Sequence, residues 1–238
     1  MTLPLLRKLS LLLLTTGTFA SAGYAQVKFG IKNGLNISEI LTSDHQTAII
    51  SGSPRSMRNF PKTGYNGGIF LSVPLSAKFS LQPELIYSNQ GATGKPSSGY
   101  TINATESYKL NFLNVPLLLQ YKVPMGFFIE TGPQWGLLLS AKINEDIVGV
   151  TNTNHYHVKD SYKSTDFSWV LGGGYVSPIN LGFDIRYNLG LSNFNNANSR
   201  KMSEAPVQDG SIKNSVVQMS IFYLFGRIKS RPPAIEGN

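Results

Sequence analysis

Six charged side chains lie inside stretches where apolar and polar residues alternate, and they are the residues of this sequence best suited to chemistry. They are Lys28, Lys32, Glu84, Glu130, Asp184 and Arg186. Three cations and three carboxylates could pair in an ionic network, line a narrow path for ions, or supply two carboxylates for acid–base catalysis. The choice among these depends on the elements that hold the six side chains.

Two further groups have the composition of a reactive site but not its spacing. His155 and His157 would share one side of an extended segment and could hold a metal ion, but no further ligand lies close to them in the sequence. Ser43, Asp44 and His45 have the residue types of a hydrolytic triad, yet neighbouring positions on one loop do not make a triad. We therefore expect no metal site and no catalytic residues.

A glycine run at 172–174 raises the question of a phosphate-binding loop. Such a loop continues into Gly-Lys-Ser or Gly-Lys-Thr and a helix, and neither follows here. Glycines in a strand more often allow curvature or a closely packed neighbour. The sequence therefore predicts no cofactor, and we expect a protein without enzymatic activity.

The stretch 181–192 shows what kind of element carries these charges. Its odd positions are apolar or aromatic, and its even positions are polar, charged or glycine: LGFDIRYNLGLS. Alternation with a period of two indicates a strand with one apolar and one polar face. The run exceeds the roughly 5–6 residues of a usual strand and reaches the roughly 9–11 that a tilted strand needs to cross a bilayer. We interpret it as a membrane-spanning strand.

The same pattern recurs along the chain and predicts eight strands. Their ranges are 27–38, 63–75, 78–90, 107–122, 126–140, 166–176, 181–192 and 215–225. Pro83 has no amide donor, so we expect a bulge or a local break there. Tyr108, Leu110 and Phe112 follow one apolar phase and the residues from Leu113 onward follow the other, which predicts a bulge within 112–114.

The connections between these strands alternate in length. The intervals 39–62, 91–106, 141–165 and 193–214 are long, whereas 76–77, 123–125 and 177–180 are short. Outer-membrane barrels have short periplasmic turns and long external loops. The predicted fold class is therefore all-β, an eight-stranded antiparallel up-and-down transmembrane β-barrel.

Such a barrel assigns the two faces of every strand. Apolar side chains would meet lipid, and the six charged side chains would point into a lumen that side chains can fill. Because an unpaired buried charge is costly, we expect the three cations and three carboxylates to pair there. An ion path or a catalytic carboxylate pair is the functional alternative. A soluble lipocalin-like carrier would need the opposite faces, with an apolar lumen and a polar exterior.

Aromatic residues gather toward one end of the outward faces. Near the periplasmic rim they are Phe29, Phe79, Tyr121, Phe127, Tyr175, Phe183, Tyr223 and Phe225, and a sparser external set comprises Tyr65, Tyr87, Phe167 and Trp169. A general preference of aromatic residues for strands does not explain clustering at one end. The distribution predicts an aromatic girdle at the membrane interface.

The N-terminal segment predicts export. Arg7 and Lys8 precede an apolar stretch of about a dozen residues, shorter than the roughly 20 of a spanning helix. Gly23-Tyr24-Ala25 has the small-x-small form of a cleavage site, with Ala22 as the second choice. The expected parts are a signal peptide (1–25), the outer-membrane barrel (26–226) and a periplasmic tail (227–238).

Composition narrows the partners. The absence of cysteine excludes disulfides and lipid attachment through an N-terminal cysteine. The formal net charge is +8, but the cations are scattered and the protein is exported, so nucleic acid is not expected. We expect contact with outer-membrane lipid and lipopolysaccharide through their anionic headgroups, with other envelope proteins as further candidates.

Four segments carry a resemblance to a known family. They are FGIKNGLNIS at 29–38, LNVPLLLQY at 113–121, GPQWG at 132–136 and the glycine run at 172–174. The chain resembles the PorT-like outer-membrane β-barrel family, which is common in Bacteroidetes. The resemblance implies a barrel in a Gram-negative outer membrane, and its motifs carry no catalytic residue. That family takes its name from a member implicated in protein secretion.

The expected function follows from the barrel and its loops. We expect an integral outer-membrane protein that serves as a structural or surface-binding scaffold, with a lumen filled by side chains and external loops as the contact surface. Two alternatives stay open. One is an accessory component of a protein secretion or uptake complex, and the other is a lipid-modifying outer-membrane enzyme.

Overall fold

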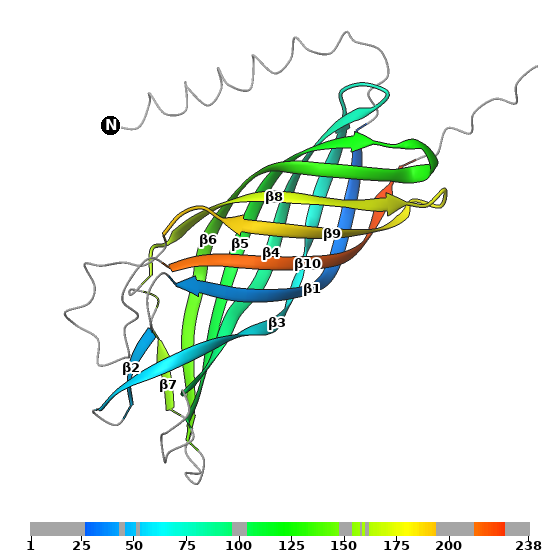
Figure 1. Ribbon diagram of the computed structural model, residues 1–238. Coiled ribbons are helices and arrows are strands. Elements are labelled where there is room, and N and C mark those ends of the chain that lie inside the picture. The colour runs from blue at the N-terminus through cyan, green and yellow to red at the C-terminus, as the bar shows by residue number, and fades with distance from the viewer. Residues whose placement is uncertain are drawn as a thin grey trace, which may run out of the picture.

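A computed structural model of the chain shows a single antiparallel β-barrel (Figure 1). It describes residues 27–42, 46–50, 53–96, 104–147, 154–157, 159, 162–193 and 212–226. The expected signal peptide and C-terminal tail lie outside the described residues. Within the described ranges, no helix combines the length and the apolar composition needed to cross a membrane.

Eight long strands of the described chain form the wall. They are β1 (Lys28–Thr42), β3 (Ser53–Pro74), β4 (Phe79–Pro96), β5 (Ala104–Lys122), β6 (Phe127–Ile147), β8 (Thr165–Val176), β9 (Leu181–Gly190) and β10 (Ile212–Phe225). Two short strands, β2 (Gln46–Ile50) and β7 (Asn154–His157), pair with β3 and β6. Each long strand matches one predicted range, whereas β2 and β7 fall in intervals expected to be loops.

The sheet closes on itself. Neighbouring long strands pair antiparallel in chain order, and β1 pairs with both β10 and β3. Gly34 of β1, for example, lies opposite Ser220 on one side and Asn66 on the other. Among the described residues, closure gives each of the eight long strands a partner on both sides, which a membrane-spanning sheet requires because hydrocarbon cannot satisfy free backbone groups. The predicted eight-stranded up-and-down barrel is confirmed.

The three connections at one end are tight turns of similar construction. In each turn, the amide at the start donates to the carbonyl four residues later: Leu75 to Phe79 at 2.9 Å, Val123 to Phe127 at 2.8 Å, and Ser177 to Leu181 at 2.8 Å. The second turn contains the 3₁₀ segment Pro124–Gly126. These are the short turns that the sequence predicts. The end of the barrel that carries them is called the periplasmic end, after that prediction, and the opposite end is called the external end.

Burial alternates along the strands in the sense required by a surrounding lipid phase. In β9 every odd residue is exposed and every even residue is buried. Ile185 is 52% exposed, whereas its neighbour Arg186 is 2% exposed. Water-soluble proteins bury apolar side chains and expose charges, so the observed faces are the reverse of those of a soluble barrel. The lipocalin-like alternative therefore does not fit the structure.

The strands differ in length, so the barrel wall is taller along β3 to β6 than along β9. β3, β4, β5 and β6 contain 22, 18, 19 and 21 residues, whereas β9 contains 10. A tilted strand needs only roughly 9–11 residues to cross a bilayer. The external ends of β3 to β6 therefore extend beyond that span, and β2 and β7 lie at the same end (Figure 1). The sequence-based ranges end short of this external wall.

The expected phase change in β5 is wrong. Tyr108, Leu110 and Phe112 are buried inside the barrel, on the same face as Asn114. The strand keeps one phase throughout, and its external half simply has an apolar inward face. The alternation rule misplaces these residues because it equates apolar with lipid-facing.

The bulge lies in the neighbouring strand β6 instead. The register between β5 and β6 passes from Asn111 opposite Ser140 to Phe112 opposite Leu138, so that Leu139 is the additional residue. The inward phase of β6 changes at this point, from Leu138 on one side to Ala141 on the other. Beyond the bulge, Ala141 and Ile143 of β6 therefore point inward and pack with the inward apolar residues of β5.

Pro83 interrupts the ladder without shifting it. The pairing of β3 with β4 stops after Phe70 opposite Glu84 and resumes at Val73 opposite Leu81, in an unchanged register. Of the two outcomes expected at Pro83, the structure shows a local break and not a bulge. The missing amide donor explains the break.

The interior consists of a polar zone between two apolar clusters. The cluster on the periplasmic side comprises Phe70, Phe128, Phe222 and Leu224. The cluster on the external side comprises Ala92, Tyr108, Leu110, Phe112, Leu138, Ala141, Ile143 and Tyr162. Buried charged and amide side chains fill the zone between them.

Candidate functional site: a charge network in the lumen

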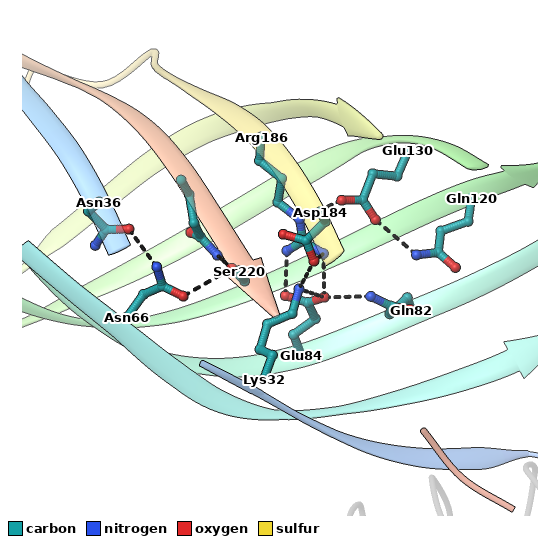
Figure 2. A network of polar contacts seen from close by, with 11 residues as sticks. Lys32, Asn36, Asn66, Gln82, Glu84, Gln120, Glu130, Asp184, Arg186 and Ser220 are labelled. Atoms are coloured by element: carbon teal, nitrogen blue, oxygen red, sulfur yellow. Dashed lines mark hydrogen bonds and ion pairs between the residues drawn. The ribbon is translucent and has the colours of Figure 1, made fainter. Parts of the chain in front are cut away.

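Four strands bring five charged side chains to one place in the lumen (Figure 2). Lys32 comes from β1, Glu84 from β4, Glu130 from β6, and Asp184 and Arg186 from β9. Each occupies an inward position of its strand, and each side chain is at most 2% exposed. The period of two in each strand is what directs all five inward.

Arg186 is the centre of the network. Its Nη1 donates to Glu84 Oε2 at 2.7 Å and its Nη2 donates to Glu84 Oε1 at 2.8 Å, which is a bidentate pair. Its Nε donates to Glu130 Oε1. Nη2 also lies 3.5 Å from Asp184 Oδ2. One guanidinium thus contacts all three carboxylates, which its rigid fork of five donors allows.

Lys32 shares two of the carboxylate oxygens that Arg186 contacts. Its Nζ donates to Asp184 Oδ2 at 2.7 Å and to Glu84 Oε1 at 3.2 Å. The same ammonium lies 5.5 Å from the ring centroid of Phe70 and 5.8 Å from that of Phe222. These distances are within the range of cation–π attraction. Lys32 therefore joins the ionic network to the apolar cluster on the periplasmic side.

Two glutamines extend the network toward the periplasmic end. Gln82 Nε2 donates to Glu84 Oε1 at 2.7 Å, and Gln120 Nε2 donates to Glu130 Oε2 at 2.9 Å. Hydrogen bonds from neutral donors lower the cost of keeping these carboxylates out of water. Their inward phase is visible in the sequence, but alternation alone does not tell which amides contact the charges.

The network contains two cations and three carboxylates. Asp184 Oδ1 is buried and has no hydrogen-bond partner among the described residues. Breaking a buried pair by removing one partner is far more costly than losing an exposed pair, because the other charge stays in a poorly solvating environment. The arrangement therefore ties β9 to β1, β4 and β6 across the lumen.

A second polar layer, which sequence reasoning did not single out, adjoins the charges on the external side. Asn66 Nδ2 donates to Asn36 Oδ1 at 3.0 Å, and Asn36 Nδ2 donates to Ser88 Oγ at 2.8 Å. Ser220 Oγ donates to Asn66 Oδ1 at 3.2 Å (Figure 2). The only signal in the sequence is the inward phase of these small polar residues.

Lys28 does not join the network, although the sequence groups it with the other five charges. It lies at the periplasmic mouth, where it lines a cavity together with Lys122. Position 28 is inward, like position 32, but it lies four residues closer to the periplasmic end of β1. Alternation fixes the face of a side chain but not which side chains at different depths can reach each other.

The eight aromatic residues expected at the periplasmic rim lie on the outer face next to the short turns. Most form cross-strand ring contacts: the centroids of Phe29 and Phe225 are 5.7 Å apart, and those of Phe127 and Tyr175 are 5.1 Å apart. The other cross-strand contacts are Phe79–Tyr121 at 5.2 Å and Tyr175–Phe183 at 6.2 Å, and Tyr223 contacts Phe225 within β10 at 5.0 Å. These rings form a band around the described barrel.

The candidate reactive groups outside the barrel fall on short external segments or outside the described residues. His155 and His157 belong to β7, opposite Asn144 and Lys142 of β6. In the part of the chain that the structure describes, no three potential ligands come together as a metal site. Ser43, Asp44 and His45 lie outside the described residues. Gly172–Gly174 lies in β8, where a side chain at Gly174 would come within 2.1 Å of the carbonyl oxygen of Phe183.

A closed antiparallel barrel with an apolar exterior and buried charges inside defines the class of transmembrane β-barrel proteins. The chain belongs to the outer membrane protein beta-barrel domain family, whose model matches residues 19–196. It is thus an outer-membrane β-barrel protein. No curated protein sequence matches the chain.

Several solved structures share the overall shape at low sequence identity. Neisserial surface protein A is 10% identical with a TM-score of 0.44, covering 83% of this chain and 97% of that chain. Ail of Yersinia pestis, solved with the heparin analogue sucrose octasulfate, is 11% identical with a TM-score of 0.41, covering 84% and 99%. OprG of Pseudomonas aeruginosa is 15% identical with a TM-score of 0.47, covering 86% and 99%. At these values the likenesses carry no argument about function.

Proposed function

We propose that the protein is a non-enzymatic scaffold of the outer membrane that binds partners at the cell surface through its external wall and loops. The observation that carries this proposal is the unequal length of the strands. β3 to β6 extend past the span needed for the bilayer, and the external halves of β4, β5 and β6 carry an apolar cluster of their own. A rigid wall of this kind can hold long loops in a defined arrangement.

The filled lumen supports a scaffold more than a channel. The ionic network crosses the lumen from β9 to β4, and apolar clusters lie on both sides of it. A hydrated ion would have to break these buried contacts to pass. We therefore expect no steady single-channel conductance when the barrel is inserted in a planar lipid bilayer. Steady conductance steps would contradict a filled lumen.

The proposed orientation in the membrane follows from the turns and the aromatic band. The short turns would face the periplasm, and the band beside them would lie at the headgroup level of that leaflet. The external ends would then meet the lipopolysaccharide leaflet and the medium. The finer assignment, a PorT-like barrel of a Bacteroidetes species, is supported by the motifs at 29–38 and 113–121.

Photo-crosslinking from two lysine positions distinguishes a surface scaffold from an accessory subunit of a secretion or uptake complex. Lys95 lies on the external extension of β4, where its Nζ is 5.4 Å from the ring centroid of Phe60, and Lys78 lies in a short turn at the other end. A photoreactive residue at position 95 should crosslink to surface partners in native membranes. Crosslinks formed only from position 78 would favour the accessory role.

The enzymatic alternative has its own test. A lipid-modifying enzyme would change the lipids of its own membrane. We expect a deletion strain to give the same mass spectrum of lipid A and phospholipids as the parent strain. A change that is restored by the wild-type gene would contradict the proposal.

A further inference from the structure

The periplasmic end of the lumen contains a cavity that the scaffold role does not explain. Its volume is about 270 Å³, and it lies between the short turn at Val123–Gly126 and the inner ends of the strands. Two lysines, Lys28 and Lys122, line it together with apolar side chains of the adjoining cluster. Its innermost polar residues, Gln82 and Gln120, are the ones that donate to the ionic network.

The two lysines lack counter-ions within the described part of the chain. Among the described residues, no carboxylate lies within ion-pair distance of either ammonium group. Glu84 and Glu130, which lie deeper in the lumen, are bound by Arg186, Lys32 and the two glutamines. The two lysines also interact with each other as like charges. Two neighbouring cations that repel each other at one cavity are stabilised by an anion placed between them.

The rest of the lining determines what kind of anion fits. Phe128, Phe222, Leu224 and Val176 give the cavity an apolar side. Phe222 and Phe128 contact each other with ring centroids 6.2 Å apart, so this side is a packed surface. The volume is slightly below the roughly 300–1,000 Å³ of sites for drug-sized ligands. A short chain or a single ring with one anionic group matches both the size and the lining.

We propose that the periplasmic mouth of the barrel is a binding site for a small amphiphilic carboxylate, held by Lys28 and Lys122 at its charged end and by Phe128 and Phe222 at its apolar end. The site is closed toward the outside by the ionic network, so the ligand enters and leaves on the periplasmic side. This binding site lies at the opposite end of the barrel from the proposed surface role.

The test is a titration of the full-length mature barrel in zwitterionic lipid nanodiscs with 3-(4-fluorophenyl)propionate, followed by ¹⁹F NMR. The neutral analogue 3-(4-fluorophenyl)propanol has the same ring without the charge, and acetate has the charge without the ring. We expect the propionate to bind at least about tenfold more tightly than either, a difference of about 1.4 kcal/mol. Equal binding of the neutral analogue, or equal signals with empty nanodiscs, would overturn the proposal.

A pair of double variants assigns the binding to these lysines. Lys28→Gln with Lys122→Gln should lower the affinity for the propionate to that for the propanol. The matched control, Lys78→Gln with Lys213→Gln, removes the same total charge from two exposed lysines outside the cavity and should leave the affinity unchanged. A heat-modifiability gel checks that each variant is folded before titration. Unchanged affinity in a folded Lys28/Lys122 variant would refute the site.

Discussion

Arg186 of β9 and Glu84 of β4 face each other across the lumen and form two parallel hydrogen bonds, at 2.7 and 2.8 Å. The two strands are not neighbours in the sheet, so this pair connects opposite parts of the wall. The same guanidinium also contacts Glu130 of β6. The barrel is therefore held together by cross-lumen contacts in addition to its backbone ladders.

Replacing Arg186 by leucine should destabilise the barrel severely. The substitution leaves three buried carboxylates with Lys32 as their only cation, and breaking a buried pair in this way costs about 3–5 kcal/mol. The measurement is urea unfolding in lipid vesicles. Arg186→Lys is the matched control, because it keeps the charge but loses the bidentate geometry, and its loss should be smaller. A loss below about 1 kcal/mol for the leucine variant would show that the network contributes little.

Gly30 and Phe70 should behave as a coupled pair. A Cβ atom at Gly30 would lie 2.2 Å from Cζ of Phe70, so Gly30→Ala forces the Phe70 ring to move. Overpacking of this kind costs about 1–3 kcal/mol. In the double variant with Phe70→Leu the alanine has room. The loss of stability of the double variant should therefore be smaller than the sum of the losses of the two single variants. Equilibrium unfolding of the four proteins of this cycle measures the coupling, and strict additivity would contradict the contact.

The lipid-facing side of β9 gives a prediction that depends on depth. Ile185 is exposed in the middle of the strand, and Leu181 is exposed at its periplasmic end. An arginine at the bilayer midplane costs about 2–4 kcal/mol, and one near the interface costs about 0–1 kcal/mol. Unfolding of Ile185→Arg and Leu181→Arg in lipid vesicles should show this difference. Equal costs would mean that the two positions do not lie at different membrane depths.

The sequence was sufficient to predict the barrel because period-two alternation is a local property of each strand. The eight ranges, the alternating connection lengths and the inward face of residues such as Asp184 all follow from it. The strand ends were less predictable. Beyond the membrane span, the outward and inward residues of β3 to β6 no longer differ in polarity as lipid-facing and lumen-facing residues do. β2 and β7 have no such contrast in the sequence and were therefore missed.

Contacts inside the lumen were predictable only in part. The inward phase identified Lys32, Glu84, Glu130 and Arg186 as residues of one compartment. It also placed Lys28 among them, because phase carries no information on depth. Depth depends on the stagger between strands, which is a property of the whole closed sheet and not of any single segment.

Phe112 of β5 faces the lumen, although the alternation in the sequence predicts that it faces lipid. Phe112 is 1% exposed and packs in the external apolar cluster, whereas Phe183 of β9 is an outward phenylalanine at 48% exposure. Phe112→Ala should leave a cavity and cost about 3–5 kcal/mol. Phe183→Ala should cost about 1 kcal/mol, because lipid fills the space and only ring contacts such as that with Tyr175 are lost.

Both substitutions remove the same atoms, so the comparison separates position from chemistry. Urea unfolding of the two variants in the same lipid vesicles gives the two losses directly. A bulge within β5 that turned its external half outward would put Phe112 in lipid, and the two losses would then be equal. The single phase of β5 requires them to differ, because it keeps Phe112 inside the barrel, opposite Leu138.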